Sequence, residues 1–398
     1  MIKFSLRGNL IYPFQLIIWH FLRTVETKII GYLFNFSDSL VYTPLMFISE
    51  FTAGLIIYLY QKNFLKKEEG SVKFFSIELI QNKQEGLVRR IDSDKKIFLL
   101  IFFSSFFDWI QFLLWTVSVP RFKKVSNSLL SRLNGFKPIF CAINYYYVLK
   151  LPLFKHHFFS LKIIFICSII VLISEFFFQE VNIFLTYWDF ILVLAFIFLS
   201  HVLSCLVDLV EKYLFEYDCL NPFITLMFEG MFGFFLSLLY FFFPGFLDDI
   251  KLVYSTNSTG NIILFSFLLF LYIILCGGRD LFRVVTTKIY SPMARNLTDY
   301  FLNPIYLIYD FSLGKDFLTN EKSNILYFIL NLIISIILSI CGCVYNEFLI
   351  LFFCGLETDT HDQIAKRALS YESVGDELES FNGDGDGDNR ENSIINNL

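Results

Sequence analysis

Long stretches of apolar residues, separated by short polar segments, recur along this 398-residue chain. A helix of about 20 apolar residues crosses the hydrocarbon core of a bilayer, which is about 30 Å thick. Because backbone groups inside lipid must bond within their own segment, such stretches are expected to be helical. The pattern predicts an all-α integral membrane protein with about ten transmembrane helices, at 10–34, 41–60, 97–118, 127–149, 158–174, 189–209, 222–243, 261–277, 291–313 and 325–353.

Polar residues interrupt two of these stretches. Arg23, Glu26 and Lys28 lie within 10–34, so an amphipathic helix at the membrane interface is the alternative for that segment. The stretch 291–313 contains Arg295, Asn296, Asp299 and Asp310. The count of ten helices depends on both segments.

The amino-acid composition supports a membrane protein. Hydrophobic residues make up 56% of the chain and charged residues 17%, against about 45–50% and about 25% in soluble domains. Lipid can solvate an apolar outer surface that water cannot. The formal net charge of -5 provides no basic surface for nucleic acid.

The eight cysteines predict neither disulfides nor a metal site. Nearly all of them lie in apolar stretches, and none lies in a segment that we expect in an oxidising lumen. Cys341 and Cys343 have no histidine partners nearby in the sequence. No metal and no other cofactor is expected.

The distribution of Lys and Arg predicts the orientation in the membrane. The longest polar insert, 61–96, contains nine of these residues, and the positive-inside rule places it in the cytosol. An even number of spans then places both termini in the cytosol. Arg279, Arg283 and Lys288 follow the stretch 261–277 and are expected in another cytosolic loop.

The segments expected on the lumenal side fit this orientation with one exception. Segments 35–40 and 175–188 contain no Lys or Arg, whereas Arg121, Lys123 and Lys124 would lie in the lumen. Glycosylation sequons begin at Asn35 and Asn257, both in predicted lumenal loops, and a third at Asn296 lies within or near a span, where it should remain unmodified.

The chain divides into two membrane halves and a tail. The first half covers 1–174, the second covers 175–356, and an acidic cytosolic tail follows at 357–398. The run 382–388 alternates Gly and Asp like a calcium loop, but Ser393 occupies the twelfth position, where a bidentate Glu is needed. The tail is therefore expected to be largely disordered.

Corresponding motifs in the two halves indicate an internal repeat. Pro44, Glu50 and Gly54 in the second span parallel Pro222, Glu229 and Gly233 in the seventh, and Lys137-Pro138 in the fourth parallels Asn303-Pro304 in the ninth. Five helices per half would give the halves opposite orientations, as in many transporters. The alternative is chance recurrence in a biased composition.

Several of these motifs resemble the drug/metabolite transporter superfamily, in its nucleotide-sugar-transporter-like solute carrier branch. The resemblance covers most of the chain from the second span to the tenth, through Phe107-Asp108-Trp109, Leu130–Gly135, Val210–Leu214, Asn221-Pro222, Glu229–Gly233, Tyr345–Leu351 and Cys354–Leu356. It implies ten helices in two inverted halves around a central cavity. It also implies exchange of a nucleotide sugar or another small metabolite without ATP hydrolysis, in an endomembrane of the Golgi, ER or vacuole.

Charged side chains in the spans are the first candidates for a substrate site, because burying charge in a membrane is costly. Glu50 and Glu229 could couple a proton or bind a polar substrate; alternatively they stabilise helix packing at Gly54 and Gly233. Arg132 and Lys137 could bind a phosphate or carboxylate. The alternatives for these two are pairing with Asp108 or Glu50, or extension toward lipid headgroups.

A second set of candidates forms a polar stripe on one helix face. Its members, spaced three to four residues apart, are Asn296, Asp299, Tyr300 and Asn303. We expect Asn296, Asp299 and Asn303 to bind substrate together with the charged residues.

Nothing in the sequence predicts an enzyme. The chain has five histidines, and His156 and His157 have no Asp or Glu at metal-ligand spacing. No Walker phosphate loop is present. The predicted function is secondary transport of a small polar metabolite, nucleotide sugars included, across an endomembrane by alternating access. The alternative is a membrane scaffold or receptor that keeps the fold without transport. Expected partners are a small-molecule substrate and the lipid bilayer, not nucleic acid, and a homodimer is a further option.

Overall fold

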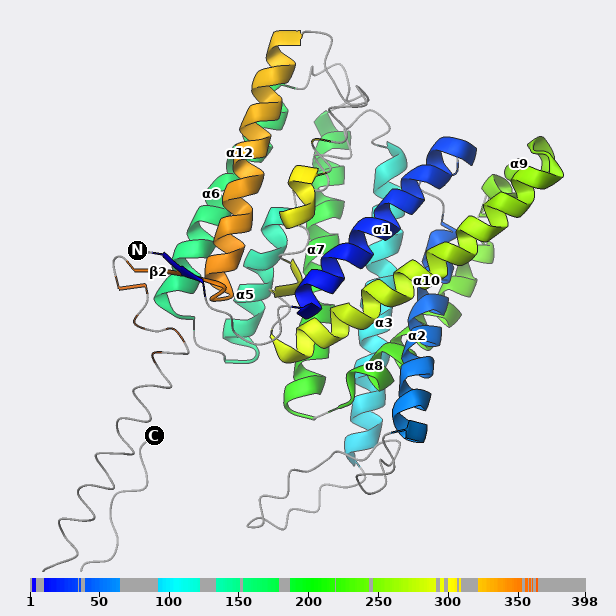
Figure 1. Cartoon of the computed structure of the whole chain (residues 1–398), viewed down its shortest axis with the longest axis horizontal. Coiled ribbons are helices and arrows are strands. Elements are labelled where there is room, and N and C mark those ends of the chain that lie inside the picture. The colour runs from blue at the N-terminus through cyan, green and yellow to red at the C-terminus, as the bar shows by residue number, and fades with distance from the viewer. Residues whose placement is uncertain are drawn as a thin grey trace, which may run out of the picture.

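The computed structural model of the chain describes residues 2–4, 11–34, 36, 40–64, 92–121, 134–150, 153–178, 187–218, 220–242, 246–290, 294–296, 300–305, 308, 321–352, 355–356, 358, 360 and 363. These residues form a bundle of helices (Figure 1). The helices are α1 (Ile11–Phe34), α2 (Tyr42–Phe64), α3 (Asp92–Arg121), α5 (Lys137–Tyr147), α6 (Lys155–Phe178), α7 (Tyr187–Glu216), α8 (Pro222–Ser237), α9 (Asp248–Thr256), α10 (Thr259–Ile289) and α12 (Glu321–Tyr345).

The prediction of a helical membrane-type fold is confirmed, but the count of ten spans is not. Within the described ranges, seven helices are long and apolar enough to cross a bilayer: α2, α3, α6, α7, α8 with its 3-10 continuation η4 (Leu238–Phe242), α10 and α12. Helix α1 has 24 residues, but its charged residues keep it out of this set. Helix α5 has only 11 residues, and the start of the predicted stretch 127–149 lies outside the described residues.

The remaining predicted boundaries shift by several residues. Of the predicted stretch 291–313, residues 294–296, 300–305 and 308 are described as helical. The boundary between the halves at 174 falls inside α6, which continues to Phe178. The predicted cytosolic loop 61–96 is helical at both ends, because α2 continues to Phe64 and α3 begins at Asp92; 65–91 lies outside the described residues, as does nearly all of the tail 357–398.

The last predicted stretch, 325–353, is not a single helix. Helix α12 ends at Tyr345, and Leu349–Leu351 form strand β2, which pairs antiparallel with β1 (Ile2–Phe4). Glu347 has a φ of 58°, and its N–H donates to the carbonyl of Val344 while that of Phe348 donates to Cys343. This Schellman-type ending turns the chain out of the helix, so the all-α prediction misses a small two-stranded sheet.

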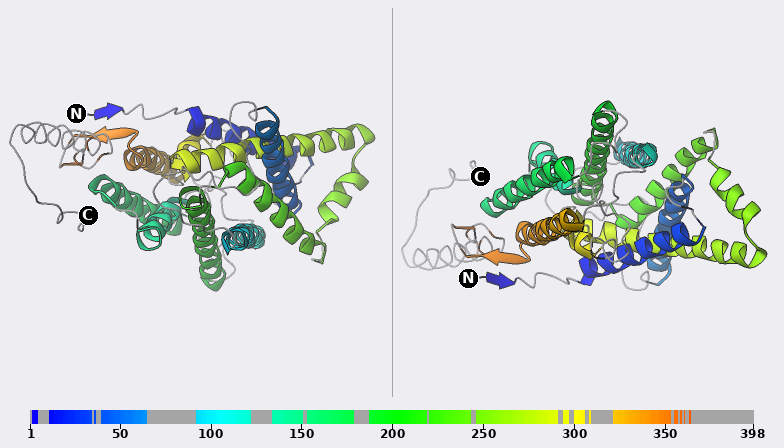
Figure 2. Two further views of the ribbon diagram at one scale, coloured as in Figure 1. Left: turned by 90° about the horizontal axis from the view of Figure 1, so that it is seen from below. Right: turned by 90° about the horizontal axis from the view of Figure 1, so that it is seen from above.

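The helices pack in a defined set of neighbours. Helix α1 packs on α10, α3 on α7, and α6 on α12; α2 contacts α8 and α10, and α3 also contacts α8. Helix α5 packs on α7. The end-on views show α6 and α12 near the two strands, with α9 at the opposite end of the bundle (Figure 2).

Glycines allow α2 and α8 to approach at backbone distance. A Cβ atom at Gly54 would lie 2.7 Å from the backbone nitrogen of Met227, and one at Gly230 would lie 2.7 Å from the carbonyl oxygen of Phe47. Gly54, which comes after Phe47 in α2, thus meets Met227, which comes before Gly230 in α8. The two helices therefore run antiparallel. Their close contact depends on the missing side chains.

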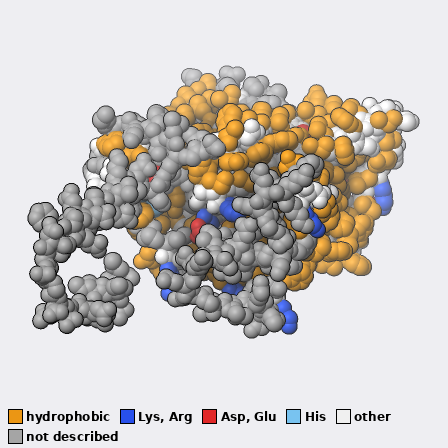
Figure 3. All heavy atoms as spheres, turned by 60° about the horizontal axis from the view of Figure 1, so that its bottom comes forward, with side chains coloured by type: hydrophobic (Ala, Val, Ile, Leu, Met, Phe, Trp, Pro, Cys, Tyr) orange, Lys and Arg blue, Asp and Glu red, His pale blue; other side chains and the backbone are white. Residues whose placement is uncertain are grey.

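The outer surface of the bundle suits lipid. Large hydrophobic side chains point outward along most helices, among them Phe242 and Trp188, which are 85% and 77% exposed. In the space-filling view, hydrophobic side chains cover most of the described surface on the visible face (Figure 3). Soluble monomers rarely expose apolar patches of this extent.

Candidate functional site

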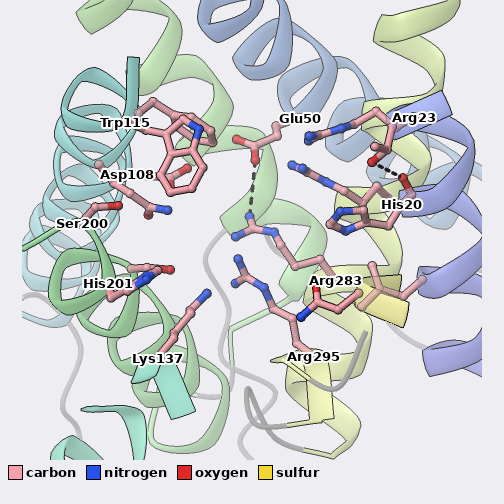
Figure 4. A pocket seen from close by; sticks show the side chains of 17 residues that line it. His20, Arg23, Glu50, Asp108, Trp115, Lys137, Ser200, His201, Arg283 and Arg295 are labelled. Atoms are coloured by element: carbon pink, nitrogen blue, oxygen red, sulfur yellow. Dashed lines mark hydrogen bonds and ion pairs between the residues drawn. The ribbon is translucent and has the colours of Figure 1, made fainter. Parts of the chain in front are cut away.

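A cavity of about 360 Å³ lies among α1, α2, α3, α5, α7, α10, Arg295 and Asn303. Five cationic and two acidic side chains line it, which gives a lining charge of 5 − 2 = +3 with His20 and His201 neutral. The cationic residues are Arg23, Lys137, Arg279, Arg283 and Arg295, and the acidic ones are Glu50 and Asp108. Ser200, Ser204, Thr24, Gln111 and Asn303 add neutral polar groups. Figure 4 shows Arg283, Arg295 and Lys137 pointing into the same space from different elements.

Arg283 is the most highly connected charge at the cavity. Its Nη1 lies 2.8 Å from Glu211 Oε1, and its Nη2 lies 3.5 Å from both Glu50 Oε1 and Glu229 Oε2. Its Nε lies 3.5 Å from Asp280 Oδ1, one helical turn earlier. Since all five side chains are at most 5% exposed, these charges interact with little screening by water.

A second ion-pair group joins α5, α7 and Arg295. Asp208 is fully buried and lies 2.5 Å from Arg295 Nη1 and 3.7 Å from Lys137 Nζ. Arg295 also lies 4.0 Å from Glu211 Oε2, which connects this group to Arg283. Both cations reach the cavity while Asp208 remains behind them, so the acid holds them without lining the space.

Glu229 lies behind the cavity rather than in it. The hydroxyl of Ser104 donates to Glu229 Oε1 over 2.6 Å, and that of Ser105 donates to the Glu229 backbone carbonyl over 3.0 Å. Both serines are on α3, so Glu229 connects α8 to α3 as well as to Arg283 on α10. These contacts support the alternative that Glu229 stabilises helix packing.

The structure brings together five of the seven predicted site residues. Glu50, Lys137 and Asn303 line the cavity, whereas Glu229 and the buried Asn296 lie beside it. Asn296 Nδ2 lies 3.8 Å from Cys141 Sγ on α5. Arg132 and Asp299 lie outside the described residues.

Sequence reasoning missed most of the cationic lining. Arg279 and Arg283 were expected in a cytosolic loop, but α10 continues to Ile289, so this prediction is wrong. Arg279 and Arg283 are four residues apart and so lie on one face of α10, but like charges at this spacing do not favour a helix, so no clear signal in the sequence marked the continuation. Arg23 and Arg295 were seen only as interruptions of predicted spans, and the expected partner of Lys137 was Asp108 or Glu50 instead of Asp208.

The cavity is suited to binding a small anion. In surroundings of low dielectric constant, Lys and Arg bind phosphate and carboxylate oxygens strongly, and Arg can do so with two parallel hydrogen bonds. Its volume falls within the usual range of about 300–1,000 Å³ for ligand pockets. Over the described part of the chain, no group of three or more His, Cys, Asp and Glu side chains is arranged to hold a metal ion.

Comparison with known proteins adds no family to this description. No protein-family model matches the chain, and no curated protein matches it. The fold and the cavity define a helical protein of the membrane-spanning type with a charged internal site.

Proposed function

We propose that the protein is a secondary transporter that moves a small polar metabolite with an anionic group, nucleotide sugars included, across an endomembrane by alternating access. The observation that carries the proposal is the cavity itself: five cations and two acids converge on about 360 Å³ of open space inside an apolar helix bundle. Charged groups are costly at this depth and are usually retained for function. A purely structural cluster would pair its charges and leave no such space.

The helix contacts support two inverted halves. In two such halves, α1 would correspond to α7, α2 to α8, α3 to α10 and α6 to α12. When each helix is replaced by its counterpart, the α1–α10 contact becomes the α7–α3 contact, and the α2–α10 contact becomes the α8–α3 contact. The α2–α8 and α6–α12 contacts map onto themselves. All of these contacts occur, and the antiparallel course of α2 and α8 fits a two-fold axis in the membrane plane, as in inverted-repeat transporters.

We propose that a buried hydrophobic cluster closes one end of the bundle, as alternating access requires. Ile97, Ile101, Leu214, Leu226 and Val284 belong to one buried cluster. Ile97 and Ile101 lie near the start of α3 and Leu214 near the end of α7, while Leu226 lies near the start of α8 and Val284 near the end of α10. A conformation open to that side would have to separate this cluster.

The alternative of a non-transporting scaffold predicts a cavity filled by phenylalanine. Phe112 is the single phenylalanine among the described lining residues, most of which are polar or charged. Both Glu50 and Glu229 contact Arg283, and Glu50 also borders the open space of the cavity. This arrangement favours transport. Membership of the drug/metabolite transporter superfamily, the endomembrane location, cytosolic termini and a homodimer remain parts of the proposal.

Uptake into proteoliposomes tests the proposal. Purified protein should show saturable uptake of a nucleotide sugar or of another small phosphorylated metabolite. Lys137→Ala should raise KM about tenfold or more, because a hydrogen bond to a charged group contributes about 1.5–3 kcal/mol, while Asp208 keeps Arg295 as a partner. Lys251→Ala is the matched control, since this lysine is 73% exposed on α9.

Two results would change the assignment. Saturable uptake that Lys137→Ala leaves unchanged would remove this lysine from the substrate path but retain transport. Failure of the folded wild-type protein to take up any metabolite of this class would favour the scaffold.

A further inference from the structure

Among the residues that the structure describes, the carboxylates around Arg283 outnumber the cations that pair with them. Five buried acids belong to the two connected ion-pair groups: Glu50, Asp208, Glu211, Glu229 and Asp280. Four cations pair with them: Lys137, Arg279, Arg283 and Arg295. The difference, 4 − 5 = −1, remains when Arg23 and Asp108 of the cavity lining are added. An uncompensated buried charge is unfavourable, so an anion that entered the cavity would increase this cost unless a proton entered with it.

Four of the five acids have a closer hydrogen-bond or ion-pair partner than Glu50 has. Asp208 has Arg295 at 2.5 Å, Glu211 has Arg283 at 2.8 Å, and Asp280 has Arg279 at 2.6 Å. Glu229 accepts a 2.6 Å hydrogen bond from Ser104. Glu50 has only the 3.5 Å contact with Arg283 Nη2 among the ion pairs and hydrogen bonds within the described residues.

Glu50 is also the only one of these five acids that borders the cavity. Figure 4 shows its carboxylate facing Arg283 across the lining. An anion that enters the cavity would compete with Glu50 for Arg283 Nη2. A displaced, ionised Glu50 would then face that anion at short range, which is unfavourable in a low dielectric.

We propose that an anionic ligand replaces Glu50 on Arg283 and that Glu50 takes up one proton from the aqueous side of the cavity as it does so, so that anion and proton move together. The inference rests on the proposed transport function and adds its driving ion. One O–H bond forms on Glu50 and the ligand oxygens accept hydrogen bonds from Nη2, with no other covalent change. When Glu50 releases the proton again, the ionised carboxylate restores the Glu50–Arg283 pair and displaces the anion.

The groups facing Glu50 come from every surrounding helix. Those of fixed positive charge are Arg23 on α1, Lys137 on α5, Arg279 and Arg283 on α10, and Arg295. The remaining acids are Asp108 on α3, Glu211 on α7, Glu229 on α8 and Asp280 on α10. His20 and His201 also line the cavity, and their imidazole rings are the rival proton acceptors.

A binding experiment tests the proton linkage without requiring transport. The probe is sulfate, a dianion that does not itself titrate between pH 5.5 and about 8, and its affinity is measured by thermal shift of the full-length protein in detergent. Uptake of one proton with the anion makes affinity fall by up to about tenfold per pH unit as pH rises. Glu50→Gln should bind sulfate with a nearly flat pH profile, whereas His20→Gln and His201→Gln should keep the slope.

An uptake experiment supplies the second readout. UDP-glucose uptake into proteoliposomes by the wild type should increase under an inwardly directed proton gradient. A pH-sensitive dye trapped inside should report acidification of the vesicle interior. Glu50→Gln should retain uptake and lose both responses. Its melting temperature, compared with the wild type, shows whether it folds.

The outcomes separate the two proposals. A flat sulfate profile in the wild type, or a slope that Glu50→Gln leaves unchanged, would overturn proton coupling at Glu50. UDP-glucose uptake indifferent to the gradient would do the same while leaving transport intact. The expected sulfate profile without uptake of UDP-glucose or of any other small phosphorylated metabolite would retain the proton-linked anion site and overturn transport.

Discussion

At the scale of single residues, the structure concentrates charge where the surroundings are least able to solvate it. Arg283 is 5% exposed on its side chain and lies within 3.5 Å of oxygens from four acids. Replacing a buried ion pair with apolar groups can be neutral, but removing one member leaves a buried charge without compensation. Each member of this cluster is therefore sensitive to substitution whether or not it contacts substrate.

Arg283→Ala should lower the free energy of unfolding by about 3–5 kcal/mol, measured as a fall in the apparent melting temperature in detergent. Adding Glu211→Gln should recover part of that loss, because Glu211 is the closest acid, at 2.8 Å. Lys251→Ala removes an exposed pair with Asp248 and should change stability by no more than about 1 kcal/mol. Equal effects of the buried and exposed substitutions would contradict this account.

At the scale of helices, the contact between α2 and α8 places Glu50 and Glu229 beside the same arginine. Both helices begin near a proline and carry a glycine four residues after the glutamate. Gly54 lets the two backbones touch and Gly233 leaves room for the ring of Phe47, and the glutamates one turn earlier meet Arg283 from two directions. The structural and the functional interpretation of these motifs hold together, because the close packing creates the charged cluster.

Gly54→Ala should destabilise the protein by about 1–3 kcal/mol, the usual cost of overpacking. The added Cβ would meet backbone atoms of Met227 and Phe223 at 2.7 and 2.8 Å, which cannot rotate away as a side chain could. Gly260→Ala is the control, since nothing lies within 4 Å of its Cβ position in α10; we expect a change within about 0.5 kcal/mol. Thermal unfolding of both variants in detergent measures the difference, and similar melting temperatures would show that α2 and α8 can separate without cost.

At the scale of the whole molecule, the charge distribution along the chain predicts an orientation in the membrane, which glycosylation can test. Asn257 caps the end of α9 immediately before α10, and its sequon residue Ser258 is exposed. Asn296, by contrast, is 3% exposed inside the bundle. One sequon is thus available to a glycosylating enzyme in the folded protein and the other is enclosed.

In a eukaryotic secretory pathway, Asn257→Gln should abolish one glycosidase-sensitive step in gel mobility, because the proposed orientation places the α9–α10 junction in the lumen. Asn296→Gln should leave mobility unchanged. An unglycosylated wild-type Asn257, together with protease protection of the 61–96 segment in sealed vesicles, would reverse the proposed orientation.

The sequence by itself determined the class of structure and part of the site. Apolar length and the satisfaction of backbone groups are local properties, so the helices of a membrane-type protein could be placed to within several residues. Glu50, Lys137 and Asn303 could be selected because charged and polar groups in apolar stretches are costly wherever the helix packs. The same local criteria ended the eighth span at 277 and so misplaced Arg279 and Arg283 in a loop.

Only the tertiary structure decided which charges meet. Arg283 is far in the sequence from Glu50, Glu211 and Glu229, and it meets them because α10 contacts α2, α7 and α8. Local hydropathy records the cost of burying an arginine but not the acid that offsets it, since that acid lies on another helix. For the same reason, the sequence could nominate Lys137 as an anion ligand, while its pairing with Asp208 and its position across the cavity from Arg283 required the folded bundle.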